Sequence, residues 1–128
     1  MSDEKKSTMA VVRSERFSRW VRKDRVGTSA IGLTAELQAN PRLGDVIPGC
    51  SGLRKVRMAE AGRGTRGGFR VVYTVLIDST LLVLLDGYSK SDKEDLSADE
   101  LSALLARATL IEVEVRAERA ANPPPSEE

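Results

Sequence analysis

Residues 68–88, GFRVVYTVLIDSTLLVLLDGY, decide the fold that the rest of the chain must fit. The first part, GFRVVYTVLI, is rich in the β-branched and aromatic residues that favour strands. The second part, LLVLLDGY, is apolar at even and odd positions alike, which is typical of a central strand buried on both faces. The turn DST between them is so short that the two strands must pair antiparallel. The stretch therefore predicts a hairpin inside a sheet.

Two shorter patterns extend this sheet. LRKVRM, at 53–58, alternates, with Lys55 and Arg57 on one face and Val56 and Met58 on the other. Short connections between neighbouring strands predict an antiparallel meander of three strands. TMAVVR, at 8–13, predicts a first strand. The prediction is a small, mainly antiparallel sheet of four strands.

Two helices are expected before the meander. SERFSRWVRKDR, at 14–25, spaces its apolar residues for an amphipathic helix with a basic outer face. Thr28 or Ser29 is expected to cap a second helix. That helix must end by Asn40, because Pro41 disfavours helical backbone in the residue before it. The segment 40–52 then predicts a loop, since it contains two prolines and three glycines.

A third helix is expected after the meander. Ser97 and Glu100 form the pattern of a capping box, and apolar residues recur along one face as far as 111. The next residues, EVEV at 112–115, alternate like a strand, and the sequence leaves their state open. Helices on both ends of a strand meander predict an α+β domain.

Composition limits the classes of protein that this chain can belong to. Its 128 residues fit one domain, expected at 8–119, between a disordered N-terminus at 1–7 and a disordered Pro-rich acidic tail at 120–128. The chain contains no histidine and one cysteine, Cys50, which predicts no disulfide, no metal centre and no cofactor. A single free cysteine suits a reducing compartment, so we expect a cytoplasmic protein. No uncharged apolar run reaches about 18 residues, so we expect no membrane span.

The strongest signal of function is a concentration of positive charge. Residues 52–73 carry six basic side chains and one acidic one, a local net charge of +5, although the whole chain carries only +1. One interpretation is a solvated, charged sheet face. We favour phosphate binding, because the charges have one sign, lie on adjacent strands and lack nearby carboxylates. The basic residues are Arg54, Lys55, Arg57, Arg63, Arg66 and Arg70.

The glycines in this stretch match a nucleotide-binding pattern without supporting that function. GRGTRG, at 62–67, fits G-x-G-x-x-G, but that site requires a helix directly after the glycines. Here the strand FRVVYTVLI follows instead. A hairpin loop that presents Arg63 and Arg66 to solvent is the better interpretation.

The order of these motifs resembles the RelE/HigB family of bacterial toxins from type II toxin–antitoxin systems. The chain has N-P at 40–41, G-D-x-I-x-G at 44–49, G-L-R-K-x-R at 52–57, G-R-G-x-R-G-G-x-R-V-x-Y at 62–73 and Y-x-K-x-x-K-x-D-L at 88–96. The resemblance covers roughly residues 8–110. It implies a small α+β RelE-like fold and a metal-independent endoribonuclease that cleaves translated mRNA on the ribosome.

The resemblance also implies roles for individual residues. The catalytic positions would be Lys55, Arg57, Arg70 and Lys93. The residues that bind RNA phosphate would be Arg54, Arg63, Arg66, Tyr88 and Lys90. The family's RelE branch has a tyrosine after its last basic cluster, but KEDLS, at 93–97, contains none. The group that accepts the proton from RNA therefore stays open among Lys90, Lys93 and Tyr88.

Partners follow from the same resemblance. A cognate antitoxin, a HigA-like helix-turn-helix protein, would neutralise the toxin, and the complex would bind operator DNA through the antitoxin. The ribosome and mRNA would be the targets, with no membrane partner. Two alternatives remain: a non-catalytic toxin of the ParE type that acts on DNA gyrase, and a degenerate toxin that only binds its antitoxin.

Overall fold

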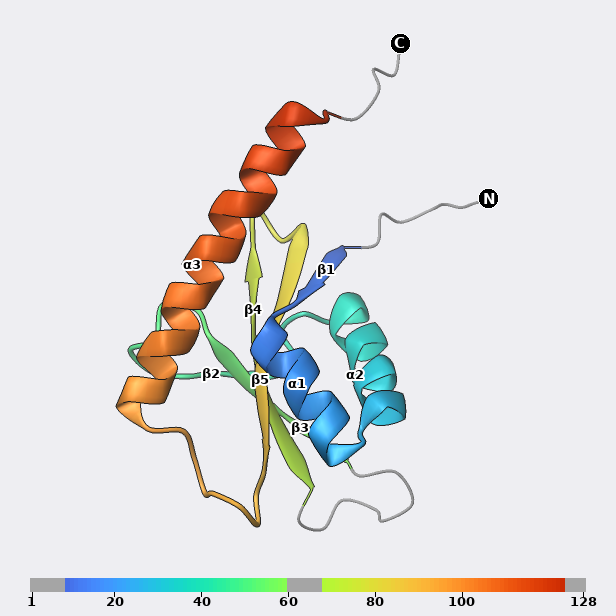
Figure 1. Cartoon of the computed structure of the whole chain (residues 1–128), viewed down its shortest axis with the longest axis vertical. Coiled ribbons are helices and arrows are strands. Elements are labelled where there is room, and N and C mark those ends of the chain that lie inside the picture. The colour runs from blue at the N-terminus through green and yellow to red at the C-terminus, as the bar shows by residue number, and fades with distance from the viewer. Residues whose placement is uncertain (1–8, 60–67, 124–128) are drawn as a thin grey trace.

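The hairpin of β4 (Phe69–Leu76) and β5 (Leu81–Ser89) forms the middle of the sheet. The computed structural model describes residues 9–59 and 68–123, and in it these two strands pair antiparallel. Strand β3 (Arg54–Met58) lies on the other side of β4, also antiparallel. The predicted three-stranded meander is therefore confirmed (Figure 1).

Two more strands complete the sheet, so the described residues contain five strands where four were predicted. β1 (Ala10–Arg13) pairs parallel with β5, and β2 (Asp45–Val46) pairs antiparallel with β3. The resulting order is β1-β5-β4-β3-β2. β2 corrects the prediction of loop for the whole of 40–52. Two residues are too few to show any alternation, which is why the sequence did not reveal this strand.

A β-bulge in the hairpin determines which way the end of β5 faces. Val72 lies opposite Asp86, but Tyr73 lies opposite Leu84, so Leu85 is an extra residue in β5. Such a bulge interrupts the strict alternation of side chains between the two faces. As a result Tyr88 shares the face of Leu85 rather than that of Leu84.

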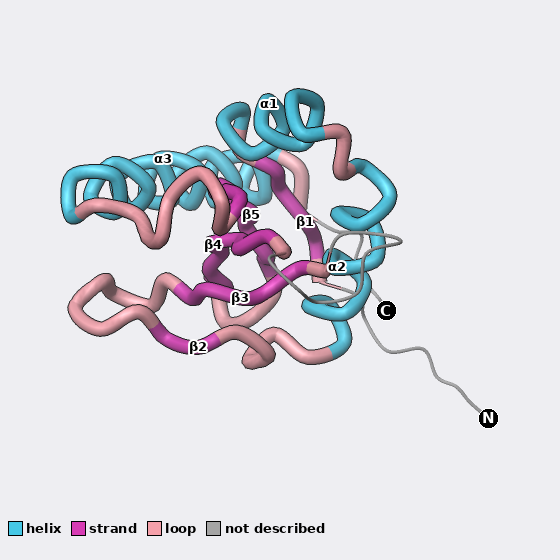
Figure 2. Tube along the Cα trace, turned by 90° about the horizontal axis from the view of Figure 1, so that it is seen from below, coloured by secondary structure: helices cyan, strands magenta, loops and turns pink. Residues whose placement is uncertain are grey.

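Helices cover both faces of the sheet and give the molecule two apolar cores (Figures 1 and 2). α1 (Glu15–Asp24) and α2 (Gly27–Ala39) pack on one face, where Phe17 and Leu37 are fully buried. α3 (Ala98–Ala121) packs on the other face through Leu104, Ala108 and Ile111. The two N-terminal helices, the C-terminal helix and the α+β class are as predicted.

The start of α1 is tied directly to β5. Ser14 caps the helix, because its hydroxyl oxygen accepts a hydrogen bond from the Phe17 amide at 3.0 Å. The same hydroxyl donates to the Leu85 carbonyl at 2.8 Å. α1 also packs closely on Gly87, where an added Cβ would lie 2.3 Å from the Trp20 ring. Only glycine lets the helix approach β5 this closely.

The ends of the other helices differ from the predictions in two places. Neither Thr28 nor Ser29 caps α2; the helix begins at Gly27 after Val26, without a side-chain cap. Val26 is buried, so core packing rather than a polar cap fixes this start. α3 begins at the predicted capping box but continues as helix through EVEV to Ala121, two residues past the expected domain end.

No helix among the described residues is both long enough and apolar enough to cross a membrane. The predictions of disorder at 1–7 and in the last residues of the tail, and of a loop at 62–67, lie outside the described residues.

Candidate functional site

Three of the predicted residues form a row across the sheet. Arg57 of β3 lies directly opposite Arg70 of β4, and Arg70 lies opposite Tyr88 of β5. Residues that pair across strands share a face, and opposite Cβ atoms lie about 5 Å apart. The row is on the α3 side of the sheet, where Tyr88 packs in the same core as Leu85 and Leu104. We call Arg57, Arg70 and Tyr88 the cross-strand row.

The two arginines of this row are not neutralised by the described part of the chain. No carboxylate within 9–59 and 68–123 forms an ion pair with Arg57 or Arg70. The hydrogen bond that Arg70 donates within these residues is a long one, 3.4 Å, to the carbonyl of Phe69. Two facing guanidinium groups repel each other, so an anion placed between them would be stabilised by both.

Lys55 joins the row from the next position on the same face of β3. It is two residues from Arg57 in the same strand, so the two side chains point to one side. Its ammonium nitrogen lies 3.2 Å and 3.3 Å from the two carboxylate oxygens of Asp95. The Tyr88 hydroxyl donates to Asp95 Oδ1 at 3.2 Å. Asp95 therefore links Lys55 to Tyr88 and orients both.

This network changes the proton affinities of its members. Burial, followed by the charge and hydrogen bond of Asp95, raises the pKa of Tyr88 to about 12. Partial burial tends to raise the pKa of Asp95, but hydrogen bonds from Lys55, the Leu96 amide and Tyr88 outweigh it and lower that pKa. At neutral pH Tyr88 is a protonated donor and Asp95 is an ionised acceptor.

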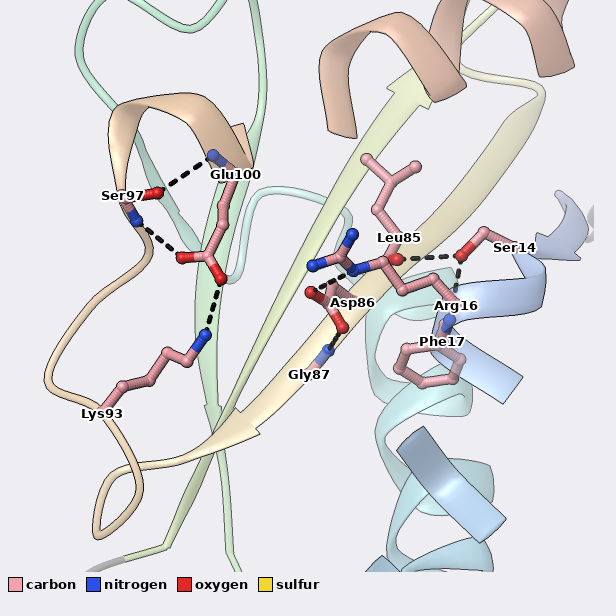
Figure 3. Close-up of polar contacts among 9 residues, drawn as sticks. All are labelled: Ser14, Arg16, Phe17, Leu85, Asp86, Gly87, Lys93, Ser97 and Glu100. Carbon is pink, nitrogen blue, oxygen red and sulfur yellow. Dashed lines mark hydrogen bonds and ion pairs between the residues drawn. The ribbon is translucent and has the colours of Figure 1, made fainter. Parts of the chain in front are cut away.

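Lys93 occupies a different place from the cross-strand row. Its ammonium group lies 2.7 Å from Glu100 Oε2, at the first turn of α3 (Figure 3). Glu100 also accepts from the Ser97 amide at 2.8 Å, and Ser97 accepts from the Glu100 amide. The bond from Lys93, with that from Ser97, lowers the pKa of Glu100. Lys93 is thus held at the helix start by the capping box.

The remaining predicted residues do not gather at the row. Arg54 lies on the opposite face of β3 from Lys55, and its guanidinium donates to the Gly44 carbonyl at 2.7 Å. Lys90 is exposed in the turn after β5. Arg63 and Arg66 lie outside the described residues. The structure therefore brings together Lys55, Arg57, Arg70 and Tyr88, and separates Arg54 from them.

A groove of about 590 Å³ adjoins the row at Tyr88. It opens beside β5 where the pairing with β1 has ended at Leu84. One side is lined by α1, the other by the turn after β5. Its basic residues are Arg16, Arg19, Lys23 and Lys93, and its acidic residues are Asp86 and Asp92.

Arg16 is fixed inside this groove by Asp86 (Figure 3). The Arg16 Nε lies 2.9 Å from Asp86 Oδ2, and Asp86 Oδ1 accepts from the Gly87 amide at 2.8 Å. Among the described residues, Arg19 and Lys23 have no such buried partner, and Arg19 approaches the exposed Glu15 at 3.9 Å. The groove therefore carries positive charge along α1.

Comparison with known proteins agrees with this fold. A family model described as the RelE toxin of the RelE / RelB toxin–antitoxin system matches residues 9–119. The chain belongs to the RelE toxin family. The match spans both cores, the cross-strand row and most of α3.

Solved structures show the same fold at low sequence identity. An Escherichia coli RelE toxin mutant in the free state superposes with a TM-score of 0.55 at 15% identity, covering 80% of this chain and 98% of that one. The toxin–antitoxin complex RelBE2 from Mycobacterium tuberculosis gives a TM-score of 0.51 at 19% identity, covering 65% and 99%. At these identities the RelE likeness concerns the fold.

Two features of this RelE-family site were not predicted. Asp95 lies close in the sequence to Lys90 and Lys93, but it pairs with Lys55 from β3. The groove along α1 was missed as well, although Arg16, Arg19 and Lys23 recur every three or four residues and therefore share one helix face. Within the described ranges, no group of three or more His, Cys, Asp or Glu residues could hold a metal ion.

Proposed function

We propose that this RelE-family chain is an endoribonuclease that cleaves translated mRNA on the ribosome and so inhibits translation. The observation that carries the proposal is the pairing of Arg57 with Arg70 across two strands, without a carboxylate partner in the described part of the chain. Two like charges held close together destabilise a fold unless a ligand of opposite charge binds between them.

The proposed reaction needs no histidine. The 2′-hydroxyl of a ribose gives up its proton to a general base, and its oxygen attacks the adjacent phosphorus. The bond to the 5′-oxygen breaks and that oxygen takes up a proton, so that a 2′,3′-cyclic phosphate and a 5′-hydroxyl form. Negative charge on the phosphate oxygens increases in the transition state, and fixed cations stabilise that charge strongly in a partly desolvated site. Arg57 and Arg70 supply the cations in this scheme.

Tyr88 acts in this scheme as a hydrogen-bond donor. Its pKa of about 12 keeps the phenol protonated at neutral pH, so it is a poor general base. A phosphate between the arginines would lie beside its hydroxyl, and the one phenol proton would then turn from Asp95 to an oxygen of the anion. Lys55 contributes positive charge from the same face, with Asp95 setting its position.

The groove along α1 offers a path for RNA beyond the cleaved phosphate. It begins at Tyr88 and continues past Arg16, Arg19 and Lys23. A protein surface that binds single-stranded RNA needs positive charge along the path of the RNA backbone. Lys90, Arg63 and Arg66 are also proposed to contact RNA phosphate. Lys93, which the resemblance places among the catalytic residues, pairs with Glu100 at the edge of the groove and has no catalytic role in this scheme.

A cognate antitoxin is the proposed protein partner. Residues 52–73 carry a net charge of +5, which would bind RNA indiscriminately unless a partner covers it. The M. tuberculosis relative is described as a toxin–antitoxin complex, which supports a similar partner here. We propose an acidic antitoxin segment on or beside the cross-strand row, from a HigA-like helix-turn-helix protein that carries the complex to operator DNA.

Induced expression of the chain tests the proposed activity. We expect growth arrest with mRNA cut within translated regions, seen by mapping new 5′ ends, and no new ends when initiation on the same transcript is blocked. DNA supercoiling should stay normal during the first minutes. Arrest with intact transcripts, or arrest relieved by gyrase mutations, would overturn the proposal in favour of a toxin of the ParE type.

A further inference from the structure

Helix α3 has two apolar faces, and only one of them packs on the sheet. The inner face contributes Leu104, Ala108 and Ile111 to the core. The opposite side carries a second apolar row, whose six members are all exposed. We call them the outer row: Ala103, Ala106, Leu110, Val113, Ala117 and Ala120.

The outer row has the spacing of a coiled-coil seam. Its members alternate at intervals of three and four residues over 18 residues. Leu110 is 52% exposed and Val113 is 59% exposed, so its two largest side chains face water. An ordinary surface helix is polar on the side away from its core. The row therefore has the pattern of a helix-packing surface.

Two charged residues beside this row lack partners in the described part of the chain. Arg107 follows Ala106 and Glu114 follows Val113, so both flank the same side of the row, seven residues apart. Neither has an opposite charge three or four residues away in the helix, and no ion pair is formed by either within 9–59 and 68–123. Elsewhere on α3, Arg116 pairs with Glu112 at 3.0 Å.

We propose that a second copy of this chain packs on the outer row, with the two α3 helices antiparallel. In that register Leu110 of each copy faces Val113 of the other, and the alanines face alanines at both ends. The same register places each Arg107 beside Glu114 of the second copy, once on each side of the two-fold axis. One arrangement thus covers the apolar row and satisfies both charges.

The charges specify the antiparallel direction. In a parallel pair, Arg107 would face Ser102 and Glu114 would face Thr109, so no ion pair would form across the seam. Antiparallel packing also places the two cross-strand rows at opposite ends of the paired helices. Each cross-strand row is on the inner side of its own α3, so pairing of the helices leaves both candidate sites open. The inference therefore does not depend on the proposed activity.

The association should be weak. Four of the six outer-row residues are alanines, so the helices can approach closely but bury less than the roughly 800 Å² per partner of a standard interface. We expect a dissociation constant of about 10–100 μM, because small interfaces leave little free energy after the loss of rotational and translational freedom.

Charge exchange across the seam tests the proposal by sedimentation equilibrium, on the full chain carrying Arg70→Ala so that it can be produced. Arg107→Glu or Glu114→Arg alone creates two like-charge contacts and should weaken self-association about 10-fold. The double variant restores two opposite-charge contacts and should return to within about 3-fold of the parent. Glu36→Arg is the matched control, because it makes the same charge change at an exposed position of α2, on the other face of the sheet, and should leave association nearly unchanged.

Three results would overturn the proposal. The parent could stay monomeric at 200 μM, a concentration above the expected dissociation constant. The double variant could associate as weakly as the single variants, which would show that the two charges do not meet. Finally, Leu110→Asp could weaken the complex with the antitoxin without affecting the free chain, which would assign the outer row to the antitoxin.

Discussion

The basic residues near the end of the sheet fall into two groups that differ in what neutralises them. Lys93 is held 2.7 Å from Glu100, inside the capping box that starts α3. Arg57 and Arg70 face each other across two strands with no carboxylate partner among the described residues. Positive charge alone therefore does not mark a site. A cation that the fold has already paired is less available to a ligand than one without a carboxylate partner among the described residues.

The largest effect should come from removing both arginines of the cross-strand row. Arg57→Ala with Arg70→Ala should lower cleavage by about 1,000-fold or more, because two fixed positive charges at the phosphate are lost. The same change should leave the melting temperature unchanged or raise it slightly, since two like charges no longer repel. Single-turnover cleavage on programmed ribosomes and thermal unfolding measure both effects. Loss of activity together with a large fall in melting temperature would mean that these arginines support the fold.

A smaller effect is expected from the third member of the row. Tyr88→Phe keeps the ring in the core but removes the hydroxyl that donates to Asp95, and should slow cleavage about 10-fold. Because the pKa of Tyr88 is about 12, the rate of the parent protein should show no tyrosine ionisation between pH 6 and pH 9. A step in that range that disappears in Tyr88→Phe would show that the phenol acts as a base.

The smallest effect should come from the paired cation, and it should appear in stability. Lys93→Ala should lower the free energy of unfolding by about 0.5 kcal/mol at pH 7, since the pair with Glu100 is partly exposed. Lys90→Ala is the matched control and should not change stability, because Lys90 is exposed in the turn and forms no ion pair with the described residues.

The loss of stability caused by Lys93→Ala should depend on pH in a defined direction. The pKa of Glu100 is lowered in the folded chain from its ordinary value of 4.5, so the pair stabilises the fold fully above pH 4.5. The difference between parent and Lys93→Ala should shrink as the pH falls from 4.5 through the lower folded-state pKa. A difference that stays constant down to pH 3 would contradict the assignment of the ion pair.

The sequence predicted the parts of the fold that depend on local pattern. The hairpin followed from apolar residues at even and odd positions, and the start of α3 followed from Ser97 and Glu100. It did not predict that EVEV would continue α3, because alternation over four residues cannot distinguish a strand from one turn of helix. The contacts of α3 with the sheet, through Ile111 and Val115, decide this.

For the candidate site, the sequence predicted which side chains share a face of β3 but not how the other elements meet them. Lys55 and Arg57 on one face followed from alternation in β3, and the structure adds Arg70 to the same face through strand pairing. The position of Tyr88 depends on the bulge at Leu85, which no pattern in LLVLLDGY indicates. The pairing of Asp95 with Lys55 joins residues 40 positions apart, and only the folded chain brings them together.

The most direct test of the central claim compares two arginines on adjacent strands. Arg70 lies in the cross-strand row, whereas Arg54 lies on the opposite face of β3 and donates to the Gly44 carbonyl. We predict that Arg70→Ala slows mRNA cleavage about 100-fold, whereas Arg54→Ala changes the cleavage rate less than about 3-fold. Arg70→Lys should retain part of the rate that Arg70→Ala loses. Equal losses from Arg70→Ala and Arg54→Ala, or full activity in a folded Arg70→Ala chain, would contradict the account.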